Sequence, residues 1–371
     1  MTLESLWQDE IVVSNAPNLP KNLLDIDTIY HEPNVSDFAR GREILAKFPD
    51  AKRIEVASHW NLPGLNGNAG NASDWLKIKR HILVLGVRKA LKMEPNSRSS
   101  DFIAPSTASG CALSCAYCYV PRHKGFANPI TTFVNSEQIA LYIARHAAKQ
   151  GHKAAPTPAD DHLWVYELGC NSDTSIDAGI SLATRDLVEQ FKNLPNAKAT
   201  FATKWVNRDL LNYDPQGKTR IRFSLMPHRM AKLLDVRTSP ISERIAAIND
   251  FVEAGFEVNL NFSPVVIEDG FLDAYDELFE EVDEALSPRA KAQMVAEIIF
   301  LTHHAGLHEV NLEWHPRAED VLWQPNLQET KISNMGGRNI RYKVGLKQPL
   351  VAQFCERLRA KMPYCEVRYA F

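Results

Sequence analysis

Three of the six cysteines in this 371-residue chain lie within eight consecutive positions. Cys111, Cys115 and Cys118 have the spacing C-x3-C-x2-C, which brings three thiolates into one short loop without a fourth. A [4Fe–4S] cluster normally takes four cysteine ligands, so a loop with three leaves one iron with an open coordination position. The spacing therefore predicts an iron–sulfur centre at which a further molecule binds iron.

A structural zinc site is the alternative interpretation of this loop, with His123 as the fourth ligand, because tetrahedral zinc accepts Cys3His sets. Zinc sites usually combine closely spaced pairs of ligands, and the loop contains one such cysteine pair. The other cysteines, Cys170, Cys355 and Cys365, lie far along the chain. A disulfide framework is disfavoured, because a chain of this length buries a core without covalent cross-links.

Composition indicates a cytoplasmic enzyme with reduced thiols. The first ten residues carry three acids and no basic segment, and no apolar run approaches the roughly 18 residues that a membrane span needs. The formal net charge is −3, so no overall basic field attracts nucleic acid. A contact with DNA or RNA would therefore depend on a local basic patch.

The order of helix-like and strand-like segments predicts an α/β fold in three parts. Residues 1–98 form a small N-terminal α/β unit, with a helix at 41–48, an apolar run at 54–57 and a buried strand at 81–87. Residues 99–329 alternate strands and helices, the pattern of a parallel sheet, and six strands predict a partial (β/α)6 barrel. The expected barrel strands are 102–105, 162–168, 198–203, 220–225, 257–262 and 309–314.

Helix starts and the C-terminal part follow from local signals. Asn135 and Gln138 resemble a capping box before a helix at 139–150, and Ser239 and Ser287 each precede a proline as candidate N-caps. Residues 330–371 form a hairpin and helix extension, with Gly336-Gly337 as a two-residue turn and a helix beginning near Lys347. In barrel-type sheets the working residues lie at the carboxyl ends of the strands, and the cysteine loop follows the first barrel strand.

The cysteine loop resembles that of the radical S-adenosylmethionine (SAM) enzymes, and the similarity to one branch extends further. Segments in the same order resemble the spore photoproduct lyase family, covering most of residues 54–345. The family implies a lyase that repairs a thymine–thymine cross-link in DNA with a [4Fe–4S] cluster and SAM. The matching segments are 57–60 (ASHW), 83–88 (LVLGVR), 111–119, 170–173 (CNSD), 201–204 (FATK), 223–225 (FSL) and 341–345 (RYKVG).

The resemblance assigns the cofactor residues. It implies Cys111, Cys115 and Cys118 as iron ligands, and Ser172, Asp173, Lys204 and Ser224 as contacts to SAM. An acid or hydroxyl suits the ammonium of SAM and a cation suits its carboxylate. Read from the sequence alone, Lys204 is also a solvated lysine at a strand end, and Ser172 and Asp173 are also candidate caps of the next helix.

The resemblance also assigns Cys170, Tyr117 and Tyr119 to catalysis. Cys170 corresponds to the thiol that donates a hydrogen atom to the thymine radical, and the tyrosines to a relay that returns hydrogen to 5′-deoxyadenosine. The alternatives are that Cys170 is a small buried hydrophobic residue and that both rings shield the cluster from water.

A basic segment near the C-terminus is the candidate for DNA contact. Between Thr330 and Glu356 there are five basic residues and no acid. A basic hairpin could contact phosphates beside an extruded lesion, whereas an ordinary edge hairpin also carries lysines. The candidate substrate residues are Arg338, Arg341, Tyr342 and Lys343, and the expected electron donor is a flavodoxin or ferredoxin.

Two other functions stay open. The stretch after Lys343 departs from the family pattern, so a radical SAM enzyme acting on RNA, a peptide or a metabolite is one alternative. A non-catalytic zinc or iron–sulfur module that binds nucleic acid is the other. Histidines 303, 304, 308 and 315 are interpreted as structural, because no carboxylate set stands near them at metal-ligand spacing, and Cys355 and Cys365 as free thiols.

Overall fold

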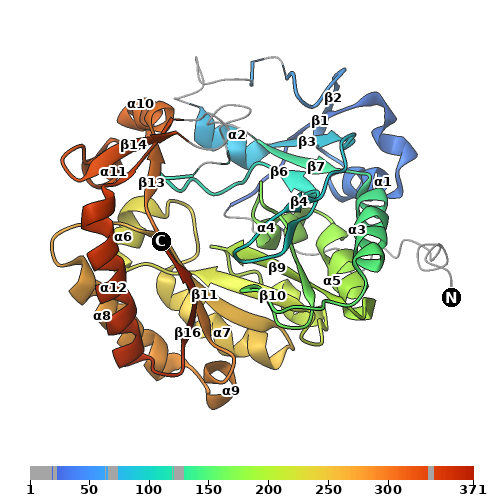
Figure 1. Cartoon of the computed structure of the whole chain (residues 1–371). Helices are drawn as coiled ribbons and strands as arrows, with labels where there is room; N and C mark the ends of the chain where they lie inside the picture. Colours follow the sequence, from blue (N-terminus) through green and yellow to red (C-terminus); the bar gives the residue numbers. More distant parts are fainter. Residues whose placement is uncertain are drawn as a thin grey trace.

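The computed structural model describes residues 19, 23–62, 64–65, 74–118, 120, 129–332 and 338–371. Tyr119, His123 and the expected Gly336-Gly337 turn lie outside these residues. Two curled sheets and a small hairpin sheet are surrounded by helices (Figure 1). No helix in the described ranges is long and apolar enough to cross a membrane.

The N-terminal sheet contains five strands in the described part of the chain, in the order β2-β1-β3-β7-β6. All neighbours run parallel except β6 and β7. The expected strand at 81–87 is confirmed as the largely buried β3, and the helix expected at 41–48 is α1. The elements are β1 Thr28–His31, η3 Pro33–Asp37, α1 Ala39–Lys47, β2 Lys52–Glu55, α2 Trp75–His81, β3 Ile82–Gly86, β6 Ala108–Ser109 and β7 Ile130–Phe133.

The larger sheet is the partial barrel, and its order within the described residues is β16-β12-β11-β10-β9-β8-β5-β4. Every neighbouring pair except β4 and β5 is parallel. Its strands are β4 Glu94–Pro95, β5 Phe102–Ile103, β8 Trp164–Glu167, β9 Ala197–Thr203, β10 Thr219–Ser224, β11 Glu257–Val265, β12 Val295–Phe300 and β16 Glu366–Ala370. The partial α/β barrel is thus confirmed, as are the first five expected strands.

Helices lie around the outside of this sheet (Figure 1). They cover a continuous core of buried aromatic and aliphatic side chains, among them Phe201, Phe223 and Phe262 on successive strands. The helical elements are α3 Ser136–Gln150, α4 Thr174–Ile180, α5 Ala183–Asn193, η5 Arg208–Asn212, α6 His228–Leu234, α7 Ile241–Glu253, α8 Phe271–Ala285, α9 Pro288–Lys291 and α12 Val344–Lys361.

The sixth expected strand, 309–314, is wrong, because this segment is the second half of α10 (Ala305–Trp314). The buried residues Leu307 and Asn311 are four apart, and Leu312 is 58% exposed, so the burial follows a helix and not a strand. The strand that takes the sixth place is β12. Its central Glu297 is fully buried between Arg222 and Arg368, at 2.9 and 2.6 Å. The charged Glu297 interrupts the apolar run of β12, and for this reason the sequence did not predict a strand here.

The expected helix starts have mixed outcomes. Ser287 caps α9 by accepting a hydrogen bond from the Ala290 amide (3.2 Å), as expected. The helix after Asn135 is confirmed, although the Asn135 side chain contacts Gln138 and not a helix amide. Ser239 does not cap α7; its hydroxyl instead accepts from the amide of Val206 (3.1 Å).

A three-stranded antiparallel sheet completes the described structure, in the order β13-β15-β14. The expected pairing of two C-terminal strands is confirmed, with Ile332 opposite Arg338, and β13 is an addition that the sequence did not indicate. The helix expected near Lys347 is α12. The remaining elements are β13 Thr302–His304, α11 Pro316–Leu322, β14 Gln328–Ile332 and β15 Arg338–Tyr342.

Candidate active site

The cysteine loop follows β6, a strand of the N-terminal sheet, and so does not directly follow the first barrel strand β5, contrary to the expectation from the sequence. Its backbone carbonyls are held by two cations: Lys79 Nζ donates to the carbonyls of Cys111 (2.8 Å) and Leu113 (3.1 Å), and Arg237 Nε donates to that of Ala112 (3.1 Å). Lys79 is almost fully buried on α2. Sequence reasoning missed Lys79 because nothing in a helix rich in basic residues marks which lysine turns inward.

The second half of the loop is fixed from the other side. The amide of Ser114 donates to the Val236 carbonyl (3.0 Å), and that of Ala116 to the Leu234 carbonyl (2.9 Å). Asn311 on α10 donates through Nδ2 to the Ala116 carbonyl (2.7 Å). Both halves of the loop therefore have fixed backbones, which orient the three thiols.

The spacing of the thiols can be compared with the spacing that a single zinc ion needs. Zn–S bonds of about 2.3 Å place the sulfurs of one tetrahedral site within about 4 Å of each other. Among the described residues, the set of three His, Cys, Asp or Glu ligand atoms within 4.8 Å of one another is not the cysteine set but His303, His308 and Glu319. The three loop sulfurs therefore do not all lie within 4.8 Å of one another in this arrangement. None of the three cysteines forms a disulfide, and the donor set fits a larger cluster.

Burial raises the pKa of the Cys111 and Cys115 thiols, and nearby cations act in the opposite direction. Lys79 lowers the pKa of Cys111, and Lys204 and Arg244 lower that of Cys115. Iron ligation requires thiolates. These cations offset only part of the effect of burial and of the Asp173 and Asp235 charges, so the pKa of both thiols stays raised and a bound metal would be needed to favour the thiolates.

Tyr117 is anchored below the loop. Its hydroxyl donates to Asp235, which also forms a fully buried ion pair with Arg244 (2.8 Å). Lys204 Nζ lies 5.5 Å from the centre of the Tyr117 ring. Burial and the Asp235 charge hold the pKa of Tyr117 well above its usual value, so the phenol keeps its proton. Asp235 and Arg244 were not indicated by the sequence.

Lys204 and Ser224 lie at the carboxyl ends of neighbouring strands. Lys204 follows β9 directly, and Ser224 is the last residue of β10. The Ser224 carbonyl accepts from Arg244 (2.7 Å), and its hydroxyl accepts from Asn261 (3.2 Å). Arg244 thus connects the Tyr117 side of the site to the end of β10.

Asp173 has the capping role that the sequence allowed. It is the N-cap of α4, accepting from the Ser175 amide (3.1 Å), and it also accepts from the Thr203 hydroxyl (2.8 Å) and the Lys204 amide (3.1 Å). These bonds join the loop after β8 to the end of β9.

Ser172 donates its hydroxyl to the buried Asp177 at 2.5 Å. Burial, with the nearby Asp173 charge, raises the pKa of Asp177 to about 8. Asp177 is therefore protonated at neutral pH. It was missed because an aspartate in the first turn of a helix is an ordinary sequence feature.

Cys170 lies in the turn after β8, beside the cysteine loop. The turn begins at Gly169, where φ is +66° and a Cβ would lie 2.1 Å from the Thr174 hydroxyl oxygen, so only glycine fits. The carbonyl of Asn171 accepts from the amide of Gly110 (2.8 Å). Cys111 follows Gly110 and Cys170 precedes Asn171, so each cysteine is the sequence neighbour of one of the two residues that this hydrogen bond joins.

The candidate substrate residues separate into exposed and buried groups. Arg338 and Lys343 are exposed, and Arg341 pairs with Glu329 (3.0 Å). Tyr342 is fully buried, and its hydroxyl accepts from the Ile267 amide (2.8 Å). This burial leaves no surface of Tyr342 for a DNA contact, so its interpretation as a substrate residue is corrected to a core role.

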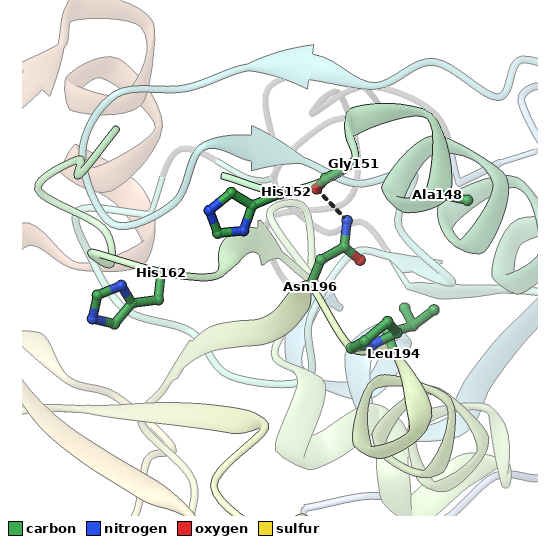
Figure 2. A pocket seen from close by; sticks show the side chains of 7 residues that line it. Ala148, Gly151, His152, His162, Leu194 and Asn196 are labelled. Atoms are coloured by element: carbon green, nitrogen blue, oxygen red, sulfur yellow. Dashed lines mark hydrogen bonds between the residues drawn. The ribbon is translucent and has the colours of Figure 1, made fainter. Parts of the chain in front are cut away.

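A pocket of about 440 Å³ lies away from these residues (Figure 2). His162 and Asn196 in its lining precede β8 and β9, so it opens at the amino ends of the strands. Asn196 closes one side by donating to the Gly151 carbonyl (2.7 Å). The cysteine loop, Cys170, Lys204 and Ser224 are at the opposite, carboxyl ends.

Fold and site define an α/β partial-barrel protein with a three-cysteine loop at the carboxyl ends of its strands. The profile of the family described as spore photoproduct lyase matches residues 24–371, and the chain belongs to this family. Spore photoproduct lyase of Bacillus subtilis (strain 168) is 31% identical over 277 residues, covering 73% of this chain and 77% of the relative. The enzyme of Geobacillus sp. (strain Y412MC61) is 28% identical over the same length and coverage.

Solved structures have the same fold. A spore photoproduct lyase double mutant with bound AdoMet and dinucleoside spore photoproduct superposes with a TM-score of 0.83 at 22% identity, covering 94% of this chain and 99% of that chain. A spore photoproduct lyase complexed with dinucleoside spore photoproduct has a TM-score of 0.82 at the same identity and coverage. At this identity the likeness establishes the fold alone.

Proposed function

We propose that this protein is a radical SAM lyase that cleaves the carbon–carbon cross-link of the thymine dimer known as spore photoproduct in DNA. Membership of the spore photoproduct lyase family supports the reaction class. The observation that carries the proposal is the hydrogen bond between Gly110 and Asn171. This bond connects the turn that contains Cys170, the candidate hydrogen donor, to the loop that contains the three cysteines, at the carboxyl ends of the barrel strands.

The chain's own residues fit both cofactors. Cys111, Cys115 and Cys118 would hold a [4Fe–4S] cluster, and Ser172, Asp173, Lys204 and Ser224 would hold SAM. When bound, the cluster and SAM together supply a 5′-deoxyadenosyl radical that removes a hydrogen atom from the substrate. Lys204 offers a cation for a carboxylate, and the acidic and hydroxyl groups after β8 offer acceptors for an ammonium.

Cys170 would then donate the hydrogen atom of its thiol to the carbon radical left after the cross-link breaks. The product gains one hydrogen atom, and Cys170 is left as a sulfur radical. Tyr117 and Tyr119 would then restore the thiol: a tyrosine hydroxyl would give its hydrogen atom to the Cys170 sulfur radical, and the resulting tyrosyl radical would take a hydrogen atom from 5′-deoxyadenosine. Asp235 accepts the Tyr117 hydroxyl hydrogen bond, which keeps the phenol protonated and in one orientation, so that it has a hydrogen atom to give.

The three-stranded sheet would contact the DNA. Arg338, Arg341 and Lys343 would neutralise phosphates, and a lesion inside a duplex would be extruded before it reaches the thiols. We place the protein in the reducing cytoplasm, where a flavodoxin or ferredoxin would supply the electron.

Anaerobic reconstitution with iron and sulfide, followed by dithionite, SAM and a synthetic dinucleoside spore photoproduct, tests this proposal. We expect release of 5′-deoxyadenosine and of two thymines per lesion, both absent from the C111A/C115A/C118A variant. Formation of 5′-deoxyadenosine without lesion cleavage would assign a different substrate. Failure to bind iron under these conditions would overturn the radical mechanism.

A further inference from the structure

Three ligand-type side chains from three elements converge beside Asn311, which also contacts the cysteine loop. His303 lies on β13, His308 on α10 and Glu319 on α11, and their ligand atoms lie within 4.8 Å of one another. The sequence favours a structural role for these histidines, because it places no carboxylate set at metal-ligand spacing from them. Glu319, on the next helix, supplies that carboxylate. We call this set the His-His-Glu triad.

The donor atoms of the triad all face Glu319. Nε2 of His303 lies 3.1 and 3.2 Å from the two carboxylate oxygens, and Nδ1 of His308 lies 2.5 Å from Oε2. Ligands bound at about 2.0–2.2 Å to one ion in tetrahedral or octahedral geometry lie about 3–3.5 Å apart. The separations from Glu319 to each histidine are within about 1 Å of these values, and all three ligand atoms lie within 4.8 Å of one another.

The triad is buried and its side chains are fixed by neighbours. The side chains of His303 and Glu319 are 0% and 4% exposed, and that of His308 is 20% exposed. His308 stacks on Trp323 with the ring centres 4.0 Å apart, and Asn311 donates to Glu319 Oε1 (2.6 Å). Hydrogen bonds to a ligating carboxylate orient it toward a metal and tune its basicity.

We propose that His303, His308 and Glu319 bind one divalent transition-metal ion, with Zn²⁺ the best match to two imidazoles and a carboxylate. Zinc commonly takes such a set of three protein ligands and one further small ligand. The partly exposed side of His308 is where this further ligand, such as water, would enter. This site is separate from the iron–sulfur loop and does not depend on the proposed lyase activity.

The position of the ion gives it a role. It would tie β13, and with it the sheet that carries the basic strand β15, to α10 and α11. Asn311 bonds both Glu319 and the Ala116 carbonyl, so the same ion would brace the cysteine loop. The metal would act as a rigid link between the candidate DNA-contacting sheet and the candidate cluster site.

The test uses the full chain with the substitutions C111A/C115A/C118A, because zinc would otherwise bind the loop thiols. After zinc loading and removal of excess metal, we expect about one zinc per chain by elemental analysis, in line with a single three-ligand site. Adding H303A, H308A or E319Q should remove it. The matched control His152→Ala, at an exposed histidine outside the triad, should retain it.

Cobalt provides a second measurement that reports coordination directly. Co²⁺ in the same background should give visible d–d absorption that disappears in the H308A variant, at a position exposed enough to tolerate the change. Zinc at background level in the folded C111A/C115A/C118A variant, or equal binding with and without H308A, would overturn the proposal. The three side chains would then form a hydrogen-bonded network around Glu319 and would not bind a metal ion.

Discussion

The cysteine loop and the His-His-Glu triad are both sets of three ligand side chains, but they are built in opposite ways. The cysteines lie within eight sequence positions, yet their sulfurs do not all come within 4.8 Å of one another. The triad residues belong to three separate elements, yet their donor atoms do. A cluster of several irons requires spaced ligands, whereas a single ion requires convergent ones. Closeness in sequence therefore does not predict closeness of ligand atoms.

The buried carboxylates of the two regions differ in the direction of their pKa shifts. Burial would raise the pKa of Glu319, but hydrogen bonds from His303, His308 and Asn311 more than offset it, and the pKa is lowered. Asp177, beside the cysteine loop, accepts one such bond from Ser172, and its pKa is raised to about 8. The triad is organised around a charged carboxylate, and the loop region contains a neutral one.

The largest effect is expected for Cys115→Ala. Two loop thiolates cannot hold a cluster that normally takes three or four protein ligands, so iron content and dithionite-dependent 5′-deoxyadenosine formation should both fall to background. The zinc of the triad should be unaffected, which separates the two sites. Cys355→Ala, at a buried cysteine far from the loop, is the matched control and should keep its iron. Full iron content in the Cys115→Ala protein would assign the cluster elsewhere.

Cys170→Ala tests the turn beside the loop. The cluster ligands are unchanged, so 5′-deoxyadenosine should still form, but thymine released per 5′-deoxyadenosine should fall roughly tenfold or more, a barrier increase of about 1.4 kcal/mol or more. Wrongly quenched thymine products should replace it, as measured by chromatography and mass spectrometry. Cys365→Ala should leave the ratio unchanged. An unaltered product distribution in Cys170→Ala would remove this thiol from the mechanism.

Asp177→Asn should change how stability depends on pH. With a pKa of about 8 when folded and 3.8 as the ordinary value, the folded state binds more protons than the unfolded state between these limits. Wild-type stability should therefore fall as pH rises through this window, by at most about 1.4 kcal/mol per pH unit from this group. Asparagine does not ionise, so the free energy of unfolding of the variant should rise relative to that of the wild type between about pH 5 and pH 8, as measured by urea unfolding.

Asp269→Asn, at an exposed aspartate, is the control for the loss of one carboxylate and should follow the wild-type curve. A pH-independent difference between wild type and Asp177→Asn would contradict a neutral Asp177 in the folded protein. The loop region would then resemble the triad, with a charged carboxylate at its centre.

Much of the molecule was predictable from patterns local in sequence. The cysteine spacing gave the loop, and runs such as 257–262 gave five barrel strands. The sequence could not show β12, because Arg222 and Arg368 neutralise Glu297 from distant strands. It suggested a strand at 309–314, where a polar Asn311 is in fact the buried residue. Lys79, Arg244 and Glu319 were missed for the same reason: a charged side chain is buried only where tertiary partners meet it.

Asn311→Ala is expected to have the smallest effect, and it tests whether the two regions are coupled. Asn311 donates to the Ala116 carbonyl and to Glu319, and its loss leaves two buried acceptors with fewer donors, which costs about 1–3 kcal/mol of stability. Zinc affinity should fall about 10- to 100-fold, the usual cost of losing a hydrogen bond to a metal ligand. Amide exchange in a peptide spanning 111–118 should also accelerate, because the loop loses one hydrogen bond that holds it.

The control Asn193→Ala, whose side chain bonds Glu189 on the surface, should change neither zinc affinity nor amide exchange. If zinc affinity fell while loop exchange stayed the same, the triad would be an independent site, because Asn311 is the direct side-chain link from Glu319 to the cysteine loop among the described residues.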